Sequence, residues 1–324
     1  MKEKIKRYLK KILTSKQITL LKKLVSLPGI TGKKISTPFK ELSCYLKYGS
    51  RDIFSILVIE THSACNRTCS YCPDSKFDRG LQSMKEMPTA MYQKIVDELH
   101  DVGWQGEIAY AFFSEPLIDE RLPDLLNYTQ KKLPRASLAI YTNGDYLTIS
   151  LYKKLMESGL TRLIITHHSE QMTDSVCKLL NYRQENPDDV KVTCQARPLW
   201  ITNRGGIIKL RDIPEIRIID CTWHMTTTVI DHTGTVTYCC QDFLPATKLG
   251  NLENESLLDI WRKPFYVKLR TEIRDKVYQL KVCQECKRYR WSDYYKKIQE
   301  EKDMPAELAT TLNVSGPAES DQEA

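Results

Sequence analysis

The sequence predicts an α/β fold built on a mostly parallel sheet, and two observations carry this prediction. Short apolar segments alternate with amphipathic segments of helical periodicity between about residues 53 and 196. Such alternation is typical of βαβ units, whose strands pair in parallel. Polar residues without periodicity follow the predicted strands rather than the helices, and β/α barrels carry their active sites at the carboxyl ends of the strands. We therefore expect the chemistry at the carboxyl edge of the sheet.

Five strands and four helices are predicted from this alternation. The strands are placed at residues 53–60, 107–113, 137–141, 162–166 and 190–196. The helices are placed at residues 89–102, 122–132, 151–158 and 173–183. The third helix is followed by Gly159, a residue type that commonly ends helices. The loop Asn203 to Gly206 ends this part of the chain, and a sixth strand is expected near residues 216–219.

The region after residue 220 has a different pattern. Strand-like segments at 226–230 and 235–238 flank Asp231-His232-Thr233-Gly234, which is typical of a hairpin turn. One amphipathic helix is expected over residues 256–270. Its apolar side carries Leu258, Ile260, Trp261, Phe265 and Leu269.

Composition indicates a protein of a reducing compartment. The chain has 324 residues, of which 41% are hydrophobic, and we find no apolar run near the ~20 residues that a membrane-spanning helix needs. The N-terminus lacks the apolar stretch of a secretory signal. Eleven cysteines in such a chain argue against a disulfide framework and favour metal ligation. We expect a cytoplasmic protein.

The basic charge is concentrated at the N-terminus. Residues 1–49 hold 13 of the 48 basic residues but 2 of the 41 acidic ones, so the rest of the chain is slightly acidic and no nucleic-acid partner is expected. Residues 1–28 contain a cationic amphipathic helix, for which we favour packing on the body or on a partner chain with the basic face solvated. The alternative is peripheral contact with the inner face of a membrane. The tail from about residue 305 has the composition of a disordered segment.

Three cysteines follow the first predicted strand within eight residues. Cys65, Cys69 and Cys72 have the spacing C-x3-C-x2-C. Their thiolates can hold three irons of a four-iron cluster, and no fourth cysteine lies nearby to ligate the remaining iron. The alternative is a zinc site, although zinc sites usually combine C-x2-C with a second such pair or with histidines.

This loop resembles the signature C-x3-C-x-aromatic-C of the radical S-adenosylmethionine (SAM) superfamily, with Tyr71 as the aromatic residue. The resemblance implies a partial, TIM-like (β/α)6 barrel and a 4Fe-4S cluster whose open iron is chelated by SAM. It also implies cleavage of SAM to a 5′-deoxyadenosyl radical that abstracts a hydrogen atom from a small-molecule substrate. A flavodoxin- or ferredoxin-type protein would donate the electron.

The same resemblance implies which residues contact SAM. Glu115, in Ser-Glu-Pro, matches a Gly-Glu-Pro segment that receives the SAM amino group, and Thr142 to Gly144 matches a Thr-Asn-Gly segment. Thr166 stands where many members have a serine near the ribose, and Arg197 is placed to meet the SAM carboxylate or the substrate. The alternative for each is a turn or cap residue. The implied set is Tyr71, Ser114, Glu115, Thr142, Asn143, Thr166 and Arg197.

Four further cysteines form a second pattern. Cys221 and Cys239 fit C-x12-G-x4-C, and Cys283 and Cys286 form C-x2-C. Four thiolates can ligate either zinc or an iron–sulfur cluster. The pattern resembles the SPASM/twitch domain of many radical SAM enzymes. Because no cysteine follows Cys286, the resemblance implies the short form, with one auxiliary 4Fe-4S cluster on these four residues.

Together these patterns predict four parts of the chain. They are a basic helical leader and linker (1–50), a radical SAM partial barrel (51–215), an auxiliary-cluster domain with a β-hairpin and a helix (216–292), and a helical end with an acidic tail (293–324).

The resemblance implies a radical SAM oxidoreductase. An arrangement with one auxiliary cluster is similar to that of aminocyclitol dehydrogenases in the superfamily, which favours two-electron oxidation of a sugar- or cyclitol-type alcohol with the auxiliary cluster as electron acceptor. Cys240 could instead return a hydrogen atom and make the enzyme an epimerase, or it could be a packed thiol. Peptide modification is a third alternative. A non-catalytic iron–sulfur or zinc-binding assembly factor is an alternative of another class.

Overall fold

The computed structural model describes residues 53–290 apart from 167–171, 196–199, 210–213, 215, 218–220, 222, 245 and 246. The basic leader, the acidic tail and Arg197 lie outside the described residues, so the interpretations made for them stay predictions. No helix among the described residues has the length and apolar character needed to cross a bilayer.

The main sheet has eight strands in the order β10-β9-β8-β1-β2-β3-β4-β5. Five of them are the predicted alternating strands, and each pairs in parallel with the next. They are β1 (Ile56–Ile59), β2 (Glu107–Tyr110), β3 (Ser137–Thr142), β4 (Arg162–Thr166) and β5 (Lys191–Gln195). The helices between them are α4 (Thr89–Asp101), α5 (Leu122–Lys132), α6 (Ile149–Glu157) and α7 (Asp174–Glu185). The predicted α/β architecture is confirmed.

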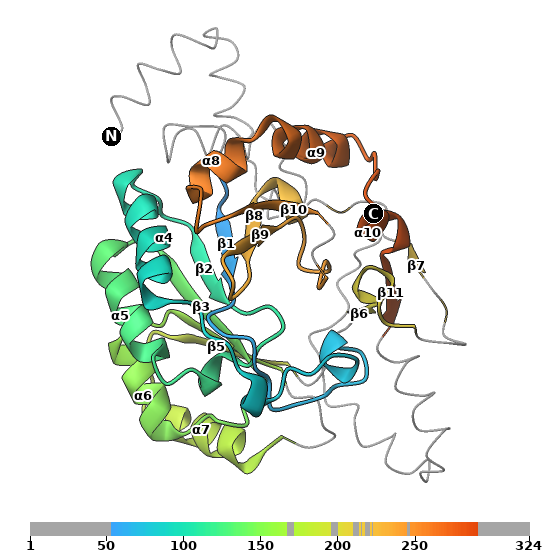
Figure 1. The fold of residues 1–324 in the computed structure, drawn as a ribbon. Coiled ribbons are helices and arrows are strands. Elements are labelled where there is room, and N and C mark those ends of the chain that lie inside the picture. The colour runs from blue at the N-terminus through green and yellow to red at the C-terminus, as the bar shows by residue number, and fades with distance from the viewer. Residues whose placement is uncertain are drawn as a thin grey trace, which may run out of the picture.

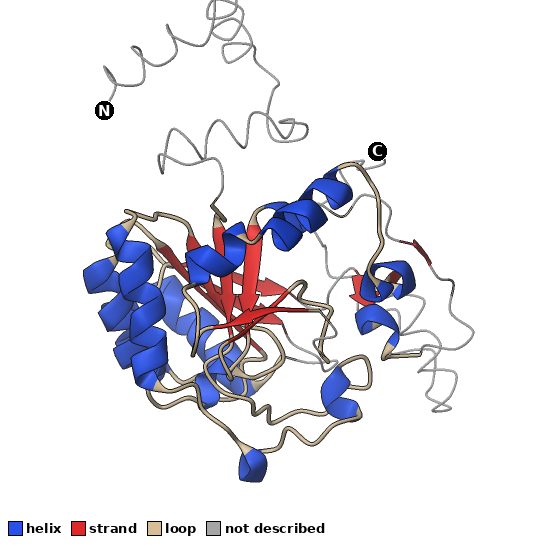
Figure 2. Cartoon of the chain, turned by 45° about the horizontal axis from the view of Figure 1, so that its top comes forward, coloured by secondary structure: helices blue, strands red, loops and turns tan. Residues whose placement is uncertain are grey.

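The four helices form one outer layer along the curved sheet (Figure 1). Figure 2 shows the strands beside this layer, with the loops that leave the strands gathered at one end. The outer strands β10 and β5 do not pair among the described residues, so the sheet is open and the barrel partial.

The sixth parallel strand was predicted in the wrong place. The segment expected near residues 216–219 contributes β7 (Ile216–Arg217), which pairs with β11 in a separate three-stranded sheet. This small sheet consists of β6 (Trp200–Thr202), β11 (Lys287–Arg290) and β7. The sixth parallel strand of the main sheet is β8 (Thr227–Ile230), which pairs with β1. It leads into the antiparallel strands β9 (Thr235–Thr237) and β10 (Lys248–Asn251).

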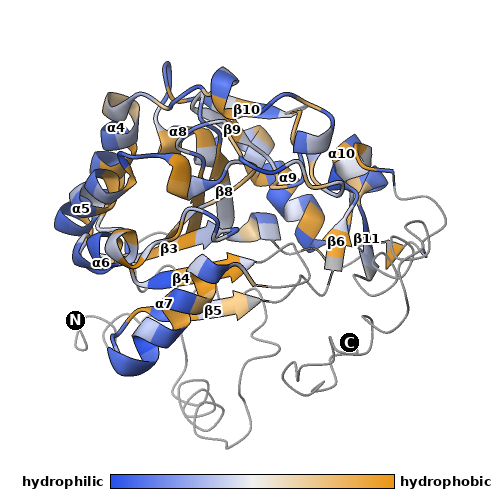
Figure 3. Ribbon diagram, turned by 90° about the horizontal axis from the view of Figure 1, so that it is seen from below, coloured by the Kyte–Doolittle hydropathy of each residue, from blue (hydrophilic) through white to orange (hydrophobic). Residues whose placement is uncertain are grey.

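The two faces of β1 pack against different surroundings because alternate residues of a strand point to opposite sides. Leu57 and Ile59 belong to the large apolar core beneath the helices. Val58 packs with Ala109 and Val229 on the inner, concave face. In Figure 3 the helices α4–α7 carry both hydrophilic and hydrophobic residues, whereas β3 and β5 are mainly hydrophobic. The inner face therefore faces away from the helix layer.

The single helix predicted over residues 256–270 is two helices, α8 (Leu257–Arg262) and α9 (Pro264–Arg274). Proline disfavours the helical conformation of the residue before it, and Lys263 accordingly has φ −52° and ψ 133°. The break also makes one prediction of burial wrong, because Phe265 is 54% exposed. The described chain ends with α10 (Lys281–Glu285) and β11.

Short 3-10 helices occupy several of the loops. They are Pro73–Ser75, Leu81–Ser83, Pro116–Ile118, Arg204–Gly206 and Trp223–Met225.

Glu98 of α4 connects the helix layer to α8. Its carboxylate accepts hydrogen bonds from the backbone N–H groups of Leu257 and Leu258, both at 2.8 Å. These are N–H groups at the start of α8 that have no partner within the helix.

We predict that Glu98→Ala lowers the free energy of unfolding by about 1–2 kcal/mol, since it leaves these two N–H groups without their acceptor. Chemical denaturation followed by fluorescence measures the change. Asp101→Ala, an exposed substitution on the same helix, is the matched control. Equal effects of the two substitutions would contradict the capping role.

Candidate functional site

The cysteine loop leaves the carboxyl end of β1, as predicted. Cys65, Cys69 and Cys72 are half-buried free thiols. The backbone N–H of Cys72 donates to the carbonyl of Cys69 at 2.8 Å, which makes the turn tight. Burial raises the pKa of Cys65 and of Cys72 to about 12. Such thiols are protonated at neutral pH, and iron would displace the protons on binding.

Residues between the cysteines are fastened to the loop that follows β3. Arg67 donates to both carboxylate oxygens of Asp145, from Nε at 2.6 Å and from Nη2 at 2.5 Å. Asn66 Nδ2 donates to Asp145 Oδ2 at 2.7 Å, and Asn143 Nδ2 donates to Asn66 Oδ1 at 2.8 Å. Two of the predicted regions, the cysteine loop and the Thr-Asn-Gly segment, therefore lie in contact.

Glu115 is buried in the same region, at 3% exposure. Its carboxylate accepts from Thr142 Oγ1 at 2.5 Å, from Asn143 N at 2.8 Å and from Leu117 N at 3.1 Å. Burial raises its pKa to about 7, and these hydrogen bonds oppose the rise. Gly144, with φ 82°, makes the turn, and a Cβ there would lie 2.7 Å from Val176 Cγ2.

The other residues predicted to contact SAM are described only in part. Tyr71 is buried, and Ser114 and Thr166 are half-buried at the carboxyl ends of β2 and β4. Tyr71 hydrogen-bonds the side chain of Cys69, which places it at the first cysteine set. The assignment of all three residues to SAM stays a prediction.

His62 is a site residue that the sequence analysis missed. It is fully buried, and its Nε2 lies 3.1 Å from the carbonyl of Glu115. Its Nδ1 accepts from the N–H of Ala64 at 3.1 Å, so Nε2 carries the proton and donates. Burial lowers the pKa of His62, consistent with the neutral ring. His62 thereby joins the start of the cysteine loop to Glu115. Its position between a predicted strand and Cys65 could have identified it as a site residue from the sequence.

The second set of cysteines surrounds one cavity. Cys221, Cys239, Cys283 and Cys286 all line a cavity of about 200 Å³, together with apolar side chains such as Val282. A water molecule takes about 30 Å³, so this space suits a group of several atoms better than a single ion. No three His, Cys, Asp or Glu side chains of the described residues converge tightly enough to hold one ion. Four thiols around an apolar space fit a cluster whose irons are ligated separately.

Two arginines and two aromatic rings lie between the cysteine sets. Phe113 follows β2, Phe243 follows Cys239, and their ring centroids are 4.8 Å apart. The Arg79 Cζ lies 5.3 Å from the Phe243 centroid, and the Arg204 Cζ lies 5.4 Å from the Phe113 centroid.

Arg204 is near both cysteine sets. Burial raises the pKa of Cys72 and of Cys286, and the charge of Arg204 partly offsets the rise at both thiols. Its Nε is buried without a hydrogen-bond partner among the described residues. The sequence analysis treated residues 203–206 only as a loop, and nothing in the local pattern marked Arg204.

Cys240 packs against the inner face of the sheet beside Val58, Ala109 and Val229, and it also lines the cavity of the second cysteine set. Gln241 Nε2 lies 3.4 Å from its sulfur. The residue therefore lies between the sheet and the second cysteine set, and its role as a hydrogen donor stays a prediction.

Comparison with known proteins agrees with this geometry. The Radical SAM superfamily matches residues 59–196, and the SPASM iron-sulfur cluster-binding domain matches residues 221–287. The S-adenosyl-L-methionine-dependent 2-deoxy-scyllo-inosamine dehydrogenase of Niallia circulans is 30% identical over 226 residues, which are 69% of this chain and 88% of that enzyme.

Two crystal structures are also similar. BtrN in complex with AdoMet and 2-DOIA has a TM-score of 0.64 and 28% identity, covering 72% of this chain and 93% of that one. BtrN in an open conformation has a TM-score of 0.53 and 26% identity, covering 69% and 87%.

We predict that Asp145→Ala weakens iron retention at the first cysteine set by about 10–100-fold, because it frees Arg67 and Asn66 from their anchor. The measurement is iron retained by the reconstituted protein against a chelator series. The matched control is Asp188→Ala, which breaks a similar pair with Arg183 far along the chain. Loss of iron in both variants alike would indicate general destabilisation instead.

Proposed function

The chain belongs to the radical SAM superfamily, as an oxidoreductase with an auxiliary iron–sulfur domain, and on this premise we propose that it oxidises a secondary alcohol of an aminocyclitol-like substrate to a ketone. The observation that carries the proposal is the cluster of Phe113, Phe243, Arg79 and Arg204, in which Arg204 is near both cysteine sets. The alcohol oxidation named for the relative supports it.

The two cysteine sets would hold the two clusters. Cys65, Cys69 and Cys72 would hold the 4Fe-4S cluster that binds SAM, and the four thiols around the apolar cavity would hold the auxiliary one. When bound, these groups supply reductive cleavage of SAM to a radical that removes a hydrogen atom from carbon, and an acceptor for the second electron.

The chain's own part begins with SAM binding. Glu115 is fixed by Thr142, Asn143 and Leu117, so its carboxylate is oriented before any ligand arrives. A buried, ionised carboxylate of this kind is a partner for the amino group of SAM, because its N–H groups can donate to the carboxylate while its lone pair binds iron.

The aromatic and arginine side chains near the cysteine sets suit a polyhydroxylated ring. Phe113 and Phe243 can pack on its C–H faces and exclude water, while the arginines donate hydrogen bonds to hydroxyl oxygens. The relative acts on an aminocyclitol, and a crystal structure of a similar chain contains 2-DOIA.

Cys240 favours a second candidate function, epimerisation. Its thiol lies on the inner face of the sheet, and a hydrogen atom returned from it to the substrate radical would invert the carbon instead of oxidising it. The two functions differ in their product, an inverted alcohol or a ketone.

A flavodoxin- or ferredoxin-type electron donor remains our proposal for the protein partner. Cytoplasmic location with peripheral membrane contact through residues 1–28 rests on the sequence pattern alone.

We predict that SAM binds more tightly as the pH rises through about 7. Glu115 has a pKa raised to about 7 by burial, and only its ionised form is purely an acceptor for the N–H groups of the SAM amino group. Calorimetric titration of the anaerobically reconstituted protein measures this. Glu115→Gln should weaken binding by about 10–100-fold and remove the pH dependence.

Glu107→Gln is the matched control, since Glu107 lies at the amino end of β2, the strand that precedes Glu115, and pairs with Arg162. Retained, pH-dependent affinity in Glu115→Gln would show that another group receives the SAM amino group.

We also predict that Cys283→Ala still releases 5′-deoxyadenosine from SAM but loses the ketone product, because the second electron then has no acceptor. Reconstituted wild-type protein should hold about eight irons per chain, and the variant about four. Cys177→Ala, a half-buried thiol on α7, is the control. Undiminished ketone formation in Cys283→Ala would remove the acceptor role of the second site.

A further inference from the structure

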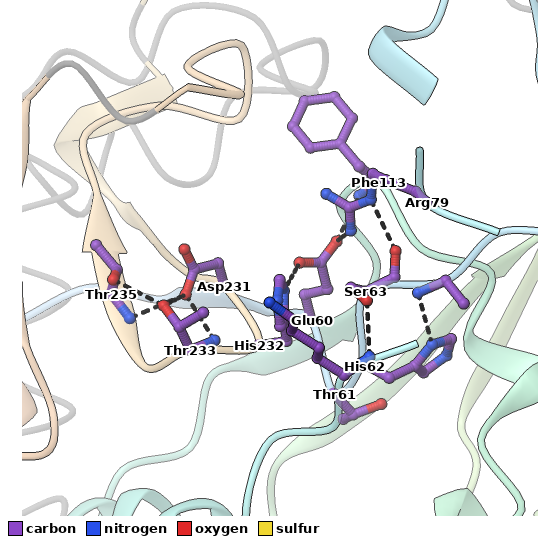
Figure 4. Close-up of polar contacts among 12 residues, drawn as sticks. Glu60, Thr61, His62, Ser63, Arg79, Phe113, Asp231, His232, Thr233 and Thr235 are labelled. Carbon is purple, nitrogen blue, oxygen red and sulfur yellow. Dashed lines mark hydrogen bonds and ion pairs between the residues drawn. The ribbon is translucent and has the colours of Figure 1, made fainter. Parts of the chain in front are cut away.

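Glu60 is a buried charge in contact with Arg79 and Phe113, two residues of the proposed substrate site. It follows β1 directly, its side chain is fully buried, and Val58 two residues earlier lies on the inner face. Its Oε1 accepts from Arg79 Nη2 at 2.5 Å and from the N–H of Phe113 at 3.2 Å. Its Oε2 lies 2.9 Å from His232 Nδ1. Figure 4 shows the carboxylate between the guanidinium of Arg79 and the ring of His232.

These contacts fix the tautomer of His232. The pKa of Glu60 lies below its usual value although burial opposes this, because His232, Arg79 and Phe113 all stabilise the charged form. An ionised carboxylate only accepts hydrogen bonds, so Nδ1 of His232 must donate. In the neutral ring, Nε2 then carries a lone pair, and it has no hydrogen-bond partner in the part of the chain that the structure describes. This is the arrangement of a histidine base oriented by a carboxylate.

The strand register places this histidine at the carboxyl edge of the sheet. Ile59 of β1 is level with Ile230 of β8, so Glu60 and the turn containing His232 leave the sheet side by side. The cysteine loop and Glu115 leave the same edge. Arg79, which holds the other oxygen of Glu60, also lies over the rings of Phe113 and Phe243. Glu60 therefore links His232 to Arg79, which lies over the two phenylalanine rings of the proposed substrate site.

Oxidation of an alcohol needs a proton acceptor there. Conversion of a secondary alcohol to a ketone removes one hydrogen atom from carbon, one electron, and one proton from oxygen. Arg79 and Arg204 cannot take the proton, because guanidinium groups stay protonated in proteins. Glu60 is already bound by three donors.

We propose that His232, oriented by Glu60, is the base that accepts the hydroxyl proton of the substrate. The O–H bond breaks, an Nε2–H bond forms, and the electron pair of the O–H bond stays on oxygen and becomes part of the carbonyl. The SAM-derived radical, when formed, would take the hydrogen atom, and an auxiliary cluster on the second cysteine set would take the remaining electron. The charged ring that results is stabilised by Glu60. This inference rests on the proposed alcohol oxidation.

Four charged groups surround the histidine. Glu60 pairs with it, Arg79 pairs with Glu60, and Asp74 lies 3.5 Å from Arg79. Asp231 precedes it in the turn, but its carboxylate is engaged by Thr233 and Thr235.

Two substitutions separate a base from a structural partner of Glu60. His232→Asn keeps a donor near the position of Nδ1 and removes Nε2, whereas His232→Leu removes both. His100→Gln, an exposed histidine on α4, is the control. The assay uses anaerobically reconstituted full chain with SAM, dithionite and 2-deoxy-scyllo-inosamine. It follows ketone formation, iron content, substrate affinity by calorimetry, and 5′-deoxyadenosine released without substrate.

For His232→Asn we expect about 10²–10⁴-fold slower ketone formation. Iron content, substrate affinity and substrate-free 5′-deoxyadenosine release should match wild type. If His232→Asn keeps the wild-type rate, the base assignment is wrong, and a defect only in His232→Leu would mean that the histidine serves Glu60. Wild-type protein that releases no 5′-deoxyadenosine would instead overturn the proposed function, and the base with it.

Discussion

The parallel pairing of β8 with β1 is the constraint on which the site depends. β1 delivers the first cysteine loop, and β8 delivers the turn and strand that lead to Cys239. Because the two strands run in the same direction and in register, the cysteine loop and the turn with His232 lie at the same edge of one sheet, and the antiparallel strand β9 then leads back to Cys239. A slip of one residue would turn alternate side chains to the opposite face and separate Glu60 from His232. The auxiliary domain is thus an extension of the barrel sheet.

Buried charges then fix the loops on this edge. Asp145 holds the residues between the cysteines, and Glu60 holds Arg79 and His232. Arg79 also reaches Asp74, whose Oδ2 lies 3.4 Å from the sulfur of Cys72. Removing one partner from such a network leaves an unpaired buried charge, which is costly. The same contacts that stabilise the loops therefore orient the groups that we assign to SAM and to the substrate.

Local patterns in the sequence predicted the cysteine sets, the first five strands and Glu115, because each depends on spacing within a short segment. Pro264 also carried enough information to predict the break between α8 and α9. The remaining features of the fold and the site depend on tertiary contacts. Nothing local in residues 227–230 shows that they pair with β1, and the roles given to Arg204 and His232 depend on neighbours far away in the sequence.

The central claim is that the first cysteine loop leaves one iron open for SAM, whereas the second set ligates its cluster fully. The most direct measurement is electron–nuclear double resonance of the reduced, reconstituted protein with SAM labelled with 15N at its amino group. The account predicts that one cluster signal changes and couples to the labelled nitrogen, that Glu115→Gln weakens this response, and that the other cluster signal stays the same. Spectra identical with and without SAM, or coupling at the cluster of Cys221 and Cys239, would contradict it.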